Sequence, residues 1–391
     1  MAVGIRPRVL HIRSSSALLG AEQVVLELLK NSAEFGVDAF LLVLRDPNDP
    51  TTQLYKVAND MGIGVTELEC GGTPSRKVLS DLRLICESYS VSALHCHGYK
   101  EDILVWLAGI SLPKVATNHL WKRTNLKLWI YSLLDALSLR TFQHVVAVSS
   151  KIQKDMNRLG VPASRTSLIL NGIDVDSISK SEPDRERLIS SLNIDKDTLL
   201  VASLSSLTPE KGIDVLVNAI DKVLRLPELQ KLSFKVLVIG EGPERPRLEA
   251  LIQDLGLEKT VVLLGHRSDA RDLLKLVDIF VLPSRNEGLP ISLLEAMASG
   301  CAVVATDVGE VKSVLSSSEQ GALIQPDDSD MTAQAIGDFL TDSRKLESCK
   351  KQGYERVSHG FSAREMTRQY CDIYSNVLGI AGNLERKRPS Y

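Results

Sequence analysis

The feature that most constrains the fold is a repeated alternation of short apolar runs with amphipathic segments of helical length. Most of the apolar runs are continuous and rich in β-branched residues, which is typical of parallel strands buried on both faces. Strands that alternate with helices in this way favour parallel α/β sheets. The predicted strands lie at residues 8–12, 39–44, 64–69, 91–96, 114–119, 144–149 and 166–171, and then at 199–205, 234–240, 260–265, 278–284 and 301–306.

The strand series stops and restarts around a polar, charged interval at residues 174–197. At 391 residues the chain is too long for one ordinary core, so two domains are expected, with the boundary in this interval. The fold prediction is α/β, with two doubly wound domains that face a central cleft. In open parallel sheets, ligands bind at the carboxyl ends of the strands.

Charge, apolar runs and cysteine spacing limit the classes of function that the chain can have. Lys and Arg total 46 against 49 Asp and Glu, for a net charge of −3, so the charge gives no support to nucleic-acid binding. No apolar run is long enough to span a bilayer and the first residues lack a signal-peptide core, so we expect a cytoplasmic protein. The six cysteines form no Cys-x-x-Cys pair, which favours buried free thiols.

The stretch RNEGLPISLLEAMASG, residues 285–300, places two glutamates around a predicted helix start. Pro290 suits the first turn of a helix, so Glu287 lies in the loop before it and Glu295 about one and a half turns inside. Amides at that start can hold a diphosphate, while Glu295 can accept hydrogen bonds from ribose and Glu287 can reach the group beyond the phosphates. An acid that complements the helix dipole, with a second buried or solvated acid, explains the same spacing.

Two other predicted strand ends carry candidate ligand residues. Gly20 follows the first strand by a short loop and precedes a helix. It is either an ordinary turn glycine or a residue that lets backbone approach an anion. Lys211 lies at a predicted helix start, where a cation opposes the dipole, and is either a phosphate ligand or a solvated lysine.

Two further patterns leave alternatives open. His95 and His97 share one face of a predicted strand, where a structural role competes with metal ligation, which would need more ligands. The segment 121–140 mixes tryptophans and basic residues along an amphipathic pattern. It fits either a helix on a membrane surface or a domain-surface helix with a buried apolar face.

The motifs VVAVSS, LILNGID, TPEKG, VIGEGPE, FVLPSRNEGLPISLLEAMASG and GALIQPDD, in this order, resemble those of glycosyltransferase family 4. The segment from Glu287 to Glu295 resembles the E-x7-E motif of that family. The resemblance covers nearly the whole chain and implies a GT-B arrangement of two Rossmann-like domains. Residues 1–180 would form the acceptor side and residues 181–360 the nucleotide-sugar side. A closing helix at 361–380 would pack back on the first domain, and residues 381–391 are predicted to be a disordered tail.

The resemblance also implies roles for residues of the second domain. Lys211 matches the lysine that neutralises the donor diphosphate. Glu295 matches the acid that holds the ribose, and Glu287 matches the acid near the transferred sugar. The amides of Gly288 and Leu289 would face phosphate or sugar oxygens.

In the first domain, the resemblance implies two more site residues. His119 falls where many members place a histidine beside the sugar and the acceptor, and Gly20 falls in the loop that closes over the donor. Family members usually need no metal ion, so we expect no metal site and no cofactor besides the nucleotide-sugar. The catalytic group would be Glu287, His119 and Lys211.

The chain departs from the family pattern at two positions. Ser206 stands where an arginine usually supplies a second phosphate-binding cation, and Ser313 stands where an acid is common. Arg13 and Arg267 are the sequence candidates to replace the missing cation, because both lie near predicted strand ends. Either donor binding is weak or another cation takes the place of the missing arginine, and we expect the second.

The combined prediction is a retaining, metal-independent glycosyltransferase that uses a UDP-linked rather than a GDP-linked sugar. The acceptor would be a saccharide or a lipid-linked molecule in polysaccharide or glycolipid synthesis, with the segment 121–140 as a contact to the inner face of the membrane. A GT-B sugar-nucleotide epimerase is the alternative enzyme. A non-catalytic nucleotide-sugar-binding protein is the third reading, suggested by Ser206.

Overall fold

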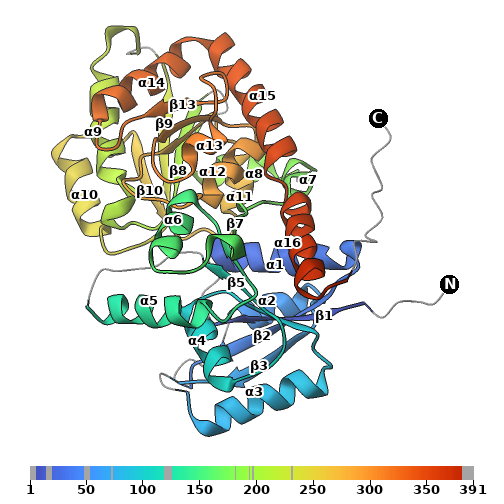
Figure 1. Ribbon diagram of the computed structural model, residues 1–391. Coiled ribbons are helices and arrows are strands. Elements are labelled where there is room, and N and C mark those ends of the chain that lie inside the picture. The colour runs from blue at the N-terminus through green and yellow to red at the C-terminus, as the bar shows by residue number, and fades with distance from the viewer. Residues whose placement is uncertain are drawn as a thin grey trace. The chain divides into compact units, whose positions relative to one another are not determined.

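The computed structural model describes residues 6–14, 20–47, 53–71, 74–118, 126–180, 182–192, 194–195, 198–229 and 232–380 (Figure 1). The chain divides into two compact units: unit 1 comprises residues 1–172 and 363–391, and unit 2 comprises residues 173–362. The expected boundary after residue 180 falls inside unit 2, because helix α7 (Val175–Lys180) packs against helix α12 (Ile291–Ala298) of that unit. The predicted tail 381–391 lies outside the described residues.

Unit 1 is built on a parallel sheet that, within the described residues, has seven strands in the order β3-β2-β1-β4-β5-β6-β7. The strand order changes direction between β1 and β4, which pair in register from Val9 with Ala93 to Ile12 with Cys96. Such a switch point is where ligands bind in open α/β sheets. The strands are Arg8–Arg13 (β1), Asp38–Arg45 (β2), Val65–Glu69 (β3), Ala93–Cys96 (β4), Lys114–Asn118 (β5), His144–Ala147 (β6) and Thr166–Leu168 (β7).

Helices connect the strands of unit 1, and one of them comes from the far end of the chain. The helix predicted at residues 361–380 is α16, which packs across α1 (Figure 1) and belongs to unit 1. Serine side chains begin two of the helices: Ser75 accepts the Val78 N–H, and Ser149 accepts the Ile152 N–H. The helices are Gly20–Ser32 (α1), Gln53–Asp60 (α2), Arg76–Ser88 (α3), Tyr99–Ala108 (α4), Leu126–Leu139 (α5), Ser150–Arg158 (α6) and Ala363–Val377 (α16).

Unit 2 repeats the same arrangement. Its parallel sheet has six strands among the described residues, in the order β10-β9-β8-β11-β12-β13, and changes direction between β8 and β11. The helix α9 packs on α14, and both cover apolar side chains of the sheet such as Val201, Val236 and Val304. The strands are Leu199–Leu204 (β8), Phe234–Ile239 (β9), Val261–Gly265 (β10), Ile279–Leu282 (β11), Ala302–Thr306 (β12) and Ala322–Ile324 (β13).

The remaining helices of unit 2 are α7 and α12, given above, with Arg185–Leu192 (α8), Ile213–Leu224 (α9), Arg245–Asp254 (α10), Ala270–Leu274 (α11), Val311–Val314 (α13), Ser329–Thr341 (α14) and Ser343–Gly360 (α15). The two parallel sheets confirm the α/β prediction, since each of the twelve predicted strands forms where its apolar run lies, and β13 is the described strand that was not predicted. The six cysteines are buried free thiols, as expected. Their burial follows from their positions in or next to apolar strands and helices.

Candidate active site

The loop after β8 carries Lys211 to the carboxyl edge of the unit 2 sheet. A short 3-10 turn, Pro209–Lys211 (η3), ends at Gly212, whose φ of 63° lies in the left-handed region. A Cβ at this residue would collide with the carbonyl group of Pro283. The glycine therefore allows the η3 loop to lie directly against the end of β11.

Lys211 and Glu287 are in contact. Lys211 Nζ donates to Glu287 Oε1 at 2.8 Å, and the Ser284 hydroxyl donates to the same oxygen at 2.7 Å. The Lys211 side chain is 23% exposed and the Glu287 side chain 9% exposed. Because Lys211 still reaches solvent, it can bind an incoming anion without the full desolvation cost of a buried ion pair.

Arg285 holds three strand-end loops of unit 2 together. Its guanidinium donates to the two carboxylate oxygens of Asp214 at 3.0 and 2.9 Å, and to Asp327 at 2.6 Å. Its backbone N–H donates to the Glu210 carbonyl at 2.8 Å. Burial would raise the pKa of Asp214, but the hydrogen bonds and charge of Arg285 hold that pKa below its usual value. The η3 loop is thereby fixed against the loop that follows β11.

Glu295 lies inside α12, and its side chain is 7% exposed. Arg271 of α11 donates from Nε to Glu295 Oε1 at 2.7 Å. Burial raises the pKa of Glu295, and the charge and hydrogen bond of Arg271 oppose that rise. In the fully described stretch 232–380, no side chain caps the start of α12, where Pro290 is the N-cap. The Leu293 N–H donates to the Pro290 carbonyl at 3.2 Å, so the amides of the first turn that precede Leu293 are the ones that can serve a ligand.

Gly288 and Leu289 connect the two glutamates. The Gly288 carbonyl accepts the Glu310 N–H at 2.8 Å. A Cβ added at Gly288 would meet no described atom within 4 Å, so the backbone there borders open space. The Leu289 side chain is buried in unit 2. Any contact of these two residues with a sugar or phosphate would come from their backbone amides, as the family resemblance implies.

Ser206, which stands in place of the expected arginine, is exposed. The two arginines predicted as substitutes are already paired with carboxylates. Arg13, in unit 1, donates to Glu22 at 2.6 Å, and Arg267 donates to both oxygens of Asp269 at 2.7 Å. Each carboxylate neutralises its arginine, so the structure gives no support to the expectation that either one replaces the missing cation.

The two candidates of the first domain, Gly20 and His119, lie next to or within residues that the structure does not describe. Gly20 is the first residue of α1, while residues 15–19 before it lie outside the described residues. Ser14, the last described residue before them, donates from its hydroxyl to Glu101 Oε1 at 2.7 Å. His119 directly follows β5 and is also outside the described residues, as is the start of the predicted segment 121–140.

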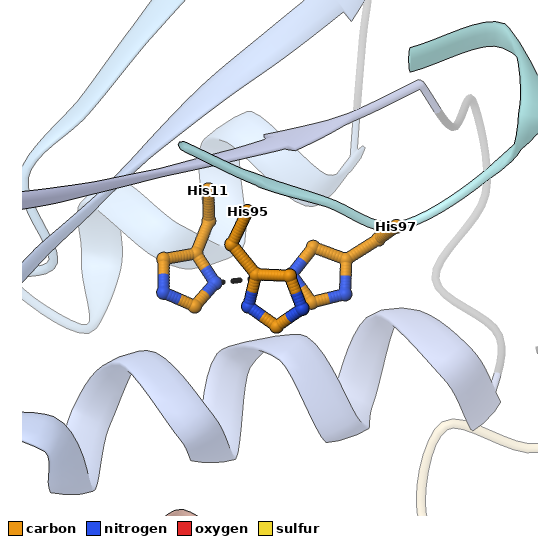
Figure 2. Close-up of side chains that lie close together, drawn as sticks. All are labelled: His11, His95 and His97. Atoms are coloured by element: carbon orange, nitrogen blue, oxygen red, sulfur yellow. Dashed lines mark hydrogen bonds between the residues drawn. The ribbon is translucent and has the colours of Figure 1, made fainter. Parts of the chain in front are cut away.

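His95 and His97 join His11 in a buried cluster (Figure 2). One ring nitrogen of each histidine lies within 4.8 Å of the others, a spacing that could hold a metal ion. His11 Nδ1 bonds to His97 Nε2 at 3.0 Å, as Figure 2 shows. His95 bonds through Nδ1 to the Tyr374 hydroxyl at 2.6 Å and through Nε2 to the Thr117 hydroxyl at 2.8 Å.

These bonds favour the structural role over metal ligation. Both nitrogens of His95 already bond to hydroxyl groups of α16 and β5, so an ion would have to break one of these bonds. Burial also lowers the pKa of His11 to about 3, which keeps its imidazole neutral at physiological pH. The cluster is a buried hydrogen-bonded network that fixes α16 to the sheet of unit 1.

The sequence reasoning missed three side chains of the unit 2 site: Ser284, Arg271 and Arg285. Ser284 directly follows an apolar strand and precedes Glu287, a position that could have suggested it. Arg271 and Arg285 are brought to their partners only by the packing of separate elements. No spacing in the sequence connects Arg271 with Glu295 or Arg285 with Asp214.

Comparison with known proteins identifies the class of protein. The model of "Glycosyltransferase Family 4" matches residues 19–177, and that of "Glycosyl transferases group 1" matches residues 184–356. The chain is 27% identical over 327 residues to alpha-maltose-1-phosphate synthase of Mycolicibacterium smegmatis, covering 76% of this chain and 82% of that one. It is 23% identical over 385 residues to UDP-Gal:alpha-D-GlcNAc-diphosphoundecaprenol alpha-1,3-galactosyltransferase of Escherichia coli, covering 95% and 97%.

Solved structures show the same fold. HepE of Anabaena in complex with UDP matches with a TM-score of 0.81 at 21% identity, over 94% of this chain and 100% of that one. Sucrose-phosphate synthase of Thermosynechococcus elongatus matches with a TM-score of 0.77 at 20% identity, over 96% and 100%. The fold is GT-B, and the chain belongs to the family 4 glycosyltransferases. It is therefore a transferase, as the motifs predict.

Proposed function

We propose that the protein is a retaining glycosyltransferase that takes a sugar from a UDP-linked donor, bound on unit 2 at the start of α12. The observation that carries the proposal is the meeting of Lys211, Ser284 and Glu287 at the carboxyl ends of β8 and β11. A partly exposed cation beside an uncapped helix start is suited to a diphosphate. The Escherichia coli relative is named for a UDP-sugar, and the HepE structure contains UDP.

The proposed chemistry depends on charge stabilisation. As the bond from the anomeric carbon to the diphosphate breaks, the electron pair goes to the phosphate oxygen, where Lys211 and the first amides of α12 stabilise it. The acceptor hydroxyl attacks from the same face, and the leaving phosphate takes its proton. Glu287, near the transferred sugar, would bind its hydroxyl groups, and Glu295 would bind the ribose. His119 is assigned beside the sugar and acceptor by the family resemblance alone.

Metal independence is part of the proposal. Lys211 would neutralise the diphosphate in place of a divalent ion, and Arg285, which donates to the Pro209 carbonyl, fixes the loop that carries Lys211. The catalytic steps above use only groups of the chain and of the substrates.

We also propose that the acceptor is a saccharide or a lipid-linked molecule met at a membrane surface. Helices α4 and α5, which pack on each other, expose the large apolar side chains Trp106, Leu107, Leu134 and Leu137. Exposed apolar side chains on neighbouring helices mark candidate contact surfaces. In the described part of the chain, no helix is long and apolar enough to cross a membrane.

A transfer assay tests the proposed function. The full-length protein is incubated with a panel of radiolabelled UDP-sugars and GDP-sugars, each with saccharide and undecaprenol-linked acceptors, in the presence of EDTA. We expect label to move from a UDP-sugar to one acceptor class, with the anomeric configuration retained in the product. An inverted product, a strict requirement for added magnesium or manganese, or an epimerised free nucleotide-sugar would contradict the proposal.

A further inference from the structure

We infer that Arg271 is a positioning residue for the donor, because it holds the Glu295 carboxylate in the orientation and ionised state that accept ribose hydroxyl groups. This role rests on the proposed function, which places the ribose at Glu295. It adds a specificity-determining contact in a separate helix, α11, to the pair of glutamates found in the motif.

The geometry of the pair supports this role. Arg271 Nε lies 2.7 Å from Glu295 Oε1, the distance of a charge-assisted hydrogen bond. In the described residues this is the side-chain bond that Glu295 accepts, and it uses one carboxylate oxygen. The second oxygen, Oε2, can accept from a ligand while Arg271 fixes the plane of the carboxylate. The Arg271 side chain is 53% exposed, so solvent reaches the pair from the Arg271 side.

Arg271 is also the charged group that lowers the pKa of Glu295 against the effect of burial. A buried carboxylate tends to protonate, and Arg271 opposes that tendency. Of the other helices packed on α12, α15 carries Lys350, which bonds to Asp278 and Glu347 instead. Two further cations of the neighbouring elements are Lys275, which follows α11 and donates to the Ser179 carbonyl, and the exposed Lys180 of α7; neither contributes to the pKa shift of Glu295.

Loss of Arg271 would have a defined consequence. Without the guanidinium, Glu295 would gain a proton at a higher pH than in the wild-type protein. A protonated carboxyl group is a weaker acceptor for the ribose hydroxyls, so nucleotide binding would weaken mainly on the acidic side. The affinity for a nucleotide that lacks both ribose hydroxyls would stay the same, because that nucleotide makes no hydrogen bond to Glu295.

The test measures nucleotide affinity by isothermal titration calorimetry on the full-length protein between pH 5.5 and 8. The ligands are UDP and 2′,3′-dideoxyuridine 5′-diphosphate. The variants are Arg271→Gln, Arg271→Lys, Glu295→Gln and the double variant Arg271→Gln/Glu295→Gln. Arg225→Gln is the matched control, because Arg225 also pairs with a carboxylate of unit 2, that of Asp221, at 2.7 Å.

We expect the wild-type protein to bind UDP at least about tenfold more tightly than the dideoxy nucleotide, from charge-assisted bonds to the ribose. Arg271→Gln should weaken UDP binding about tenfold near pH 6 and progressively less toward pH 8. The same variant should leave dideoxy binding unchanged, and Arg271→Lys should restore most of the UDP affinity. The double variant should bind UDP as Glu295→Gln does, and Arg225→Gln should match the wild type.

Two results would overturn the role of Arg271 alone. One is equal weakening of both nucleotides by Arg271→Gln at every pH, which is what a purely structural arginine would give. The other is full UDP affinity in Arg271→Gln while Glu295→Gln loses it. A wild-type protein that binds the two nucleotides equally, or does not bind UDP, would instead contradict the donor site of the proposed function, and Arg271 with it.

Discussion

The two units place polar side chains at their sheets in opposite ways. In unit 1, His11, His95 and His97 are buried: His11 bonds to His97, and His95 bonds to the hydroxyl groups of Tyr374 and Thr117. In unit 2, Lys211 and Glu287 form a charged pair on strand-end loops that solvent still reaches. The histidine network has both nitrogens of His95 bonded to hydroxyl groups of the fold, whereas the partly exposed charged pair is open to a ligand. The same kind of α/β unit therefore has a packing network in one case and the proposed binding site in the other.

The cost of burying charge explains the difference. An isolated ion in the protein interior is strongly unfavourable, so fully buried titratable groups become neutral or paired. His11 is of the first kind, because burial lowers its pKa and keeps its ring neutral. Glu295 is of the second kind, since Arg271 bonds to it. Changes in unit 1 should therefore alter stability, and changes in the unit 2 pairs should alter binding and transfer.

The largest effect is expected for Lys211→Ala. Loss of the cation that stabilises the leaving diphosphate should lower the transfer rate by about 10²- to 10³-fold. The midpoint of urea unfolding should stay close to that of the wild type, because the side chain is partly exposed. Steady-state kinetics and urea titrations on the same preparation check both parts. A variant with full transfer activity would remove Lys211 from the site.

The next largest effect is an acid destabilisation that comes from unit 1. The folded-state pKa of His11, about 3, is below its ordinary value of 6.5, so its contribution to stability is fully present above pH 6.5 and is lost as the pH falls toward 3. At pH 5 the loss should be about 2 kcal/mol. Urea unfolding between pH 4 and 7 measures it.

Two variants separate this effect from general acid unfolding. His11→Leu should give a shallower dependence of unfolding free energy on pH than the wild type. The exposed His359 provides the control, since His359→Gln should leave that dependence unchanged. An identical pH dependence in His11→Leu and the wild type would mean that His11 does not stay neutral in the fold.

A smaller loss of stability is expected for Tyr374→Phe. The change removes the hydroxyl that bonds to His95 Nδ1 at 2.6 Å and leaves a buried ring nitrogen with one bond fewer. Unfolding free energy should fall by about 1–2 kcal/mol, with no change in UDP affinity. The half-buried Tyr354 of unit 2 is the control position for the same substitution. If Tyr374→Phe changed UDP affinity and not stability, the division between the two units would be wrong.

The sequence predicted the sheets and supplied the first candidate site residues because both depend on local patterns. Apolar runs define the strands, and the positions of Lys211, Glu287 and Glu295 follow from a strand end and a helix start. Their partners across the fold come from other elements: Arg271 of α11 bonds to Glu295, and Lys211 of the loop after β8 bonds to Glu287. Such contacts depend on tertiary packing, which a single sequence does not encode in any spacing.

The same limit applied to the missing cation at Ser206. Arg13 and Arg267 were reasonable substitutes by position, but the sequence did not reveal that Glu22 and Asp269 already hold them. The histidine cluster was predictable only in part. The sequence placed His95 and His97 on one strand face, but that His11 joins them depends on the pairing of β1 with β4.

Ser206→Arg should strengthen the donor site by a modest amount. Because the two candidate substitutes are paired with carboxylates, a new arginine at this exposed position should tighten UDP binding by about tenfold, within the range for a charge-assisted hydrogen bond. Arg267→Gln should change UDP affinity little. Calorimetry on both variants checks this. The reverse pattern, a large loss in Arg267→Gln and no gain in Ser206→Arg, would show that Arg267 leaves Asp269 to bind the donor.

The smallest effect is expected at the membrane surface. Binding to vesicles that contain anionic lipid should fall as salt rises, since surface charges are screened within about 10 Å at ordinary ionic strength. Replacing Lys122, Arg123 and Lys127 with Gln should reduce co-sedimentation a fewfold and leave UDP affinity unchanged. No vesicle binding even at low salt would leave the segment 121–140 as a domain-surface helix.

Titration of UDP into Glu295→Ala and Glu287→Ala tests the donor site of unit 2 most directly. Glu295→Ala should lower UDP affinity by about tenfold or more, because the ribose is part of the free nucleotide. Glu287→Ala should leave UDP affinity within about twofold and depress transfer, because its partner Lys211 stays free to bind the diphosphate. An equal loss of UDP affinity in both variants, or no loss in either, would contradict the placement of the donor at the start of α12.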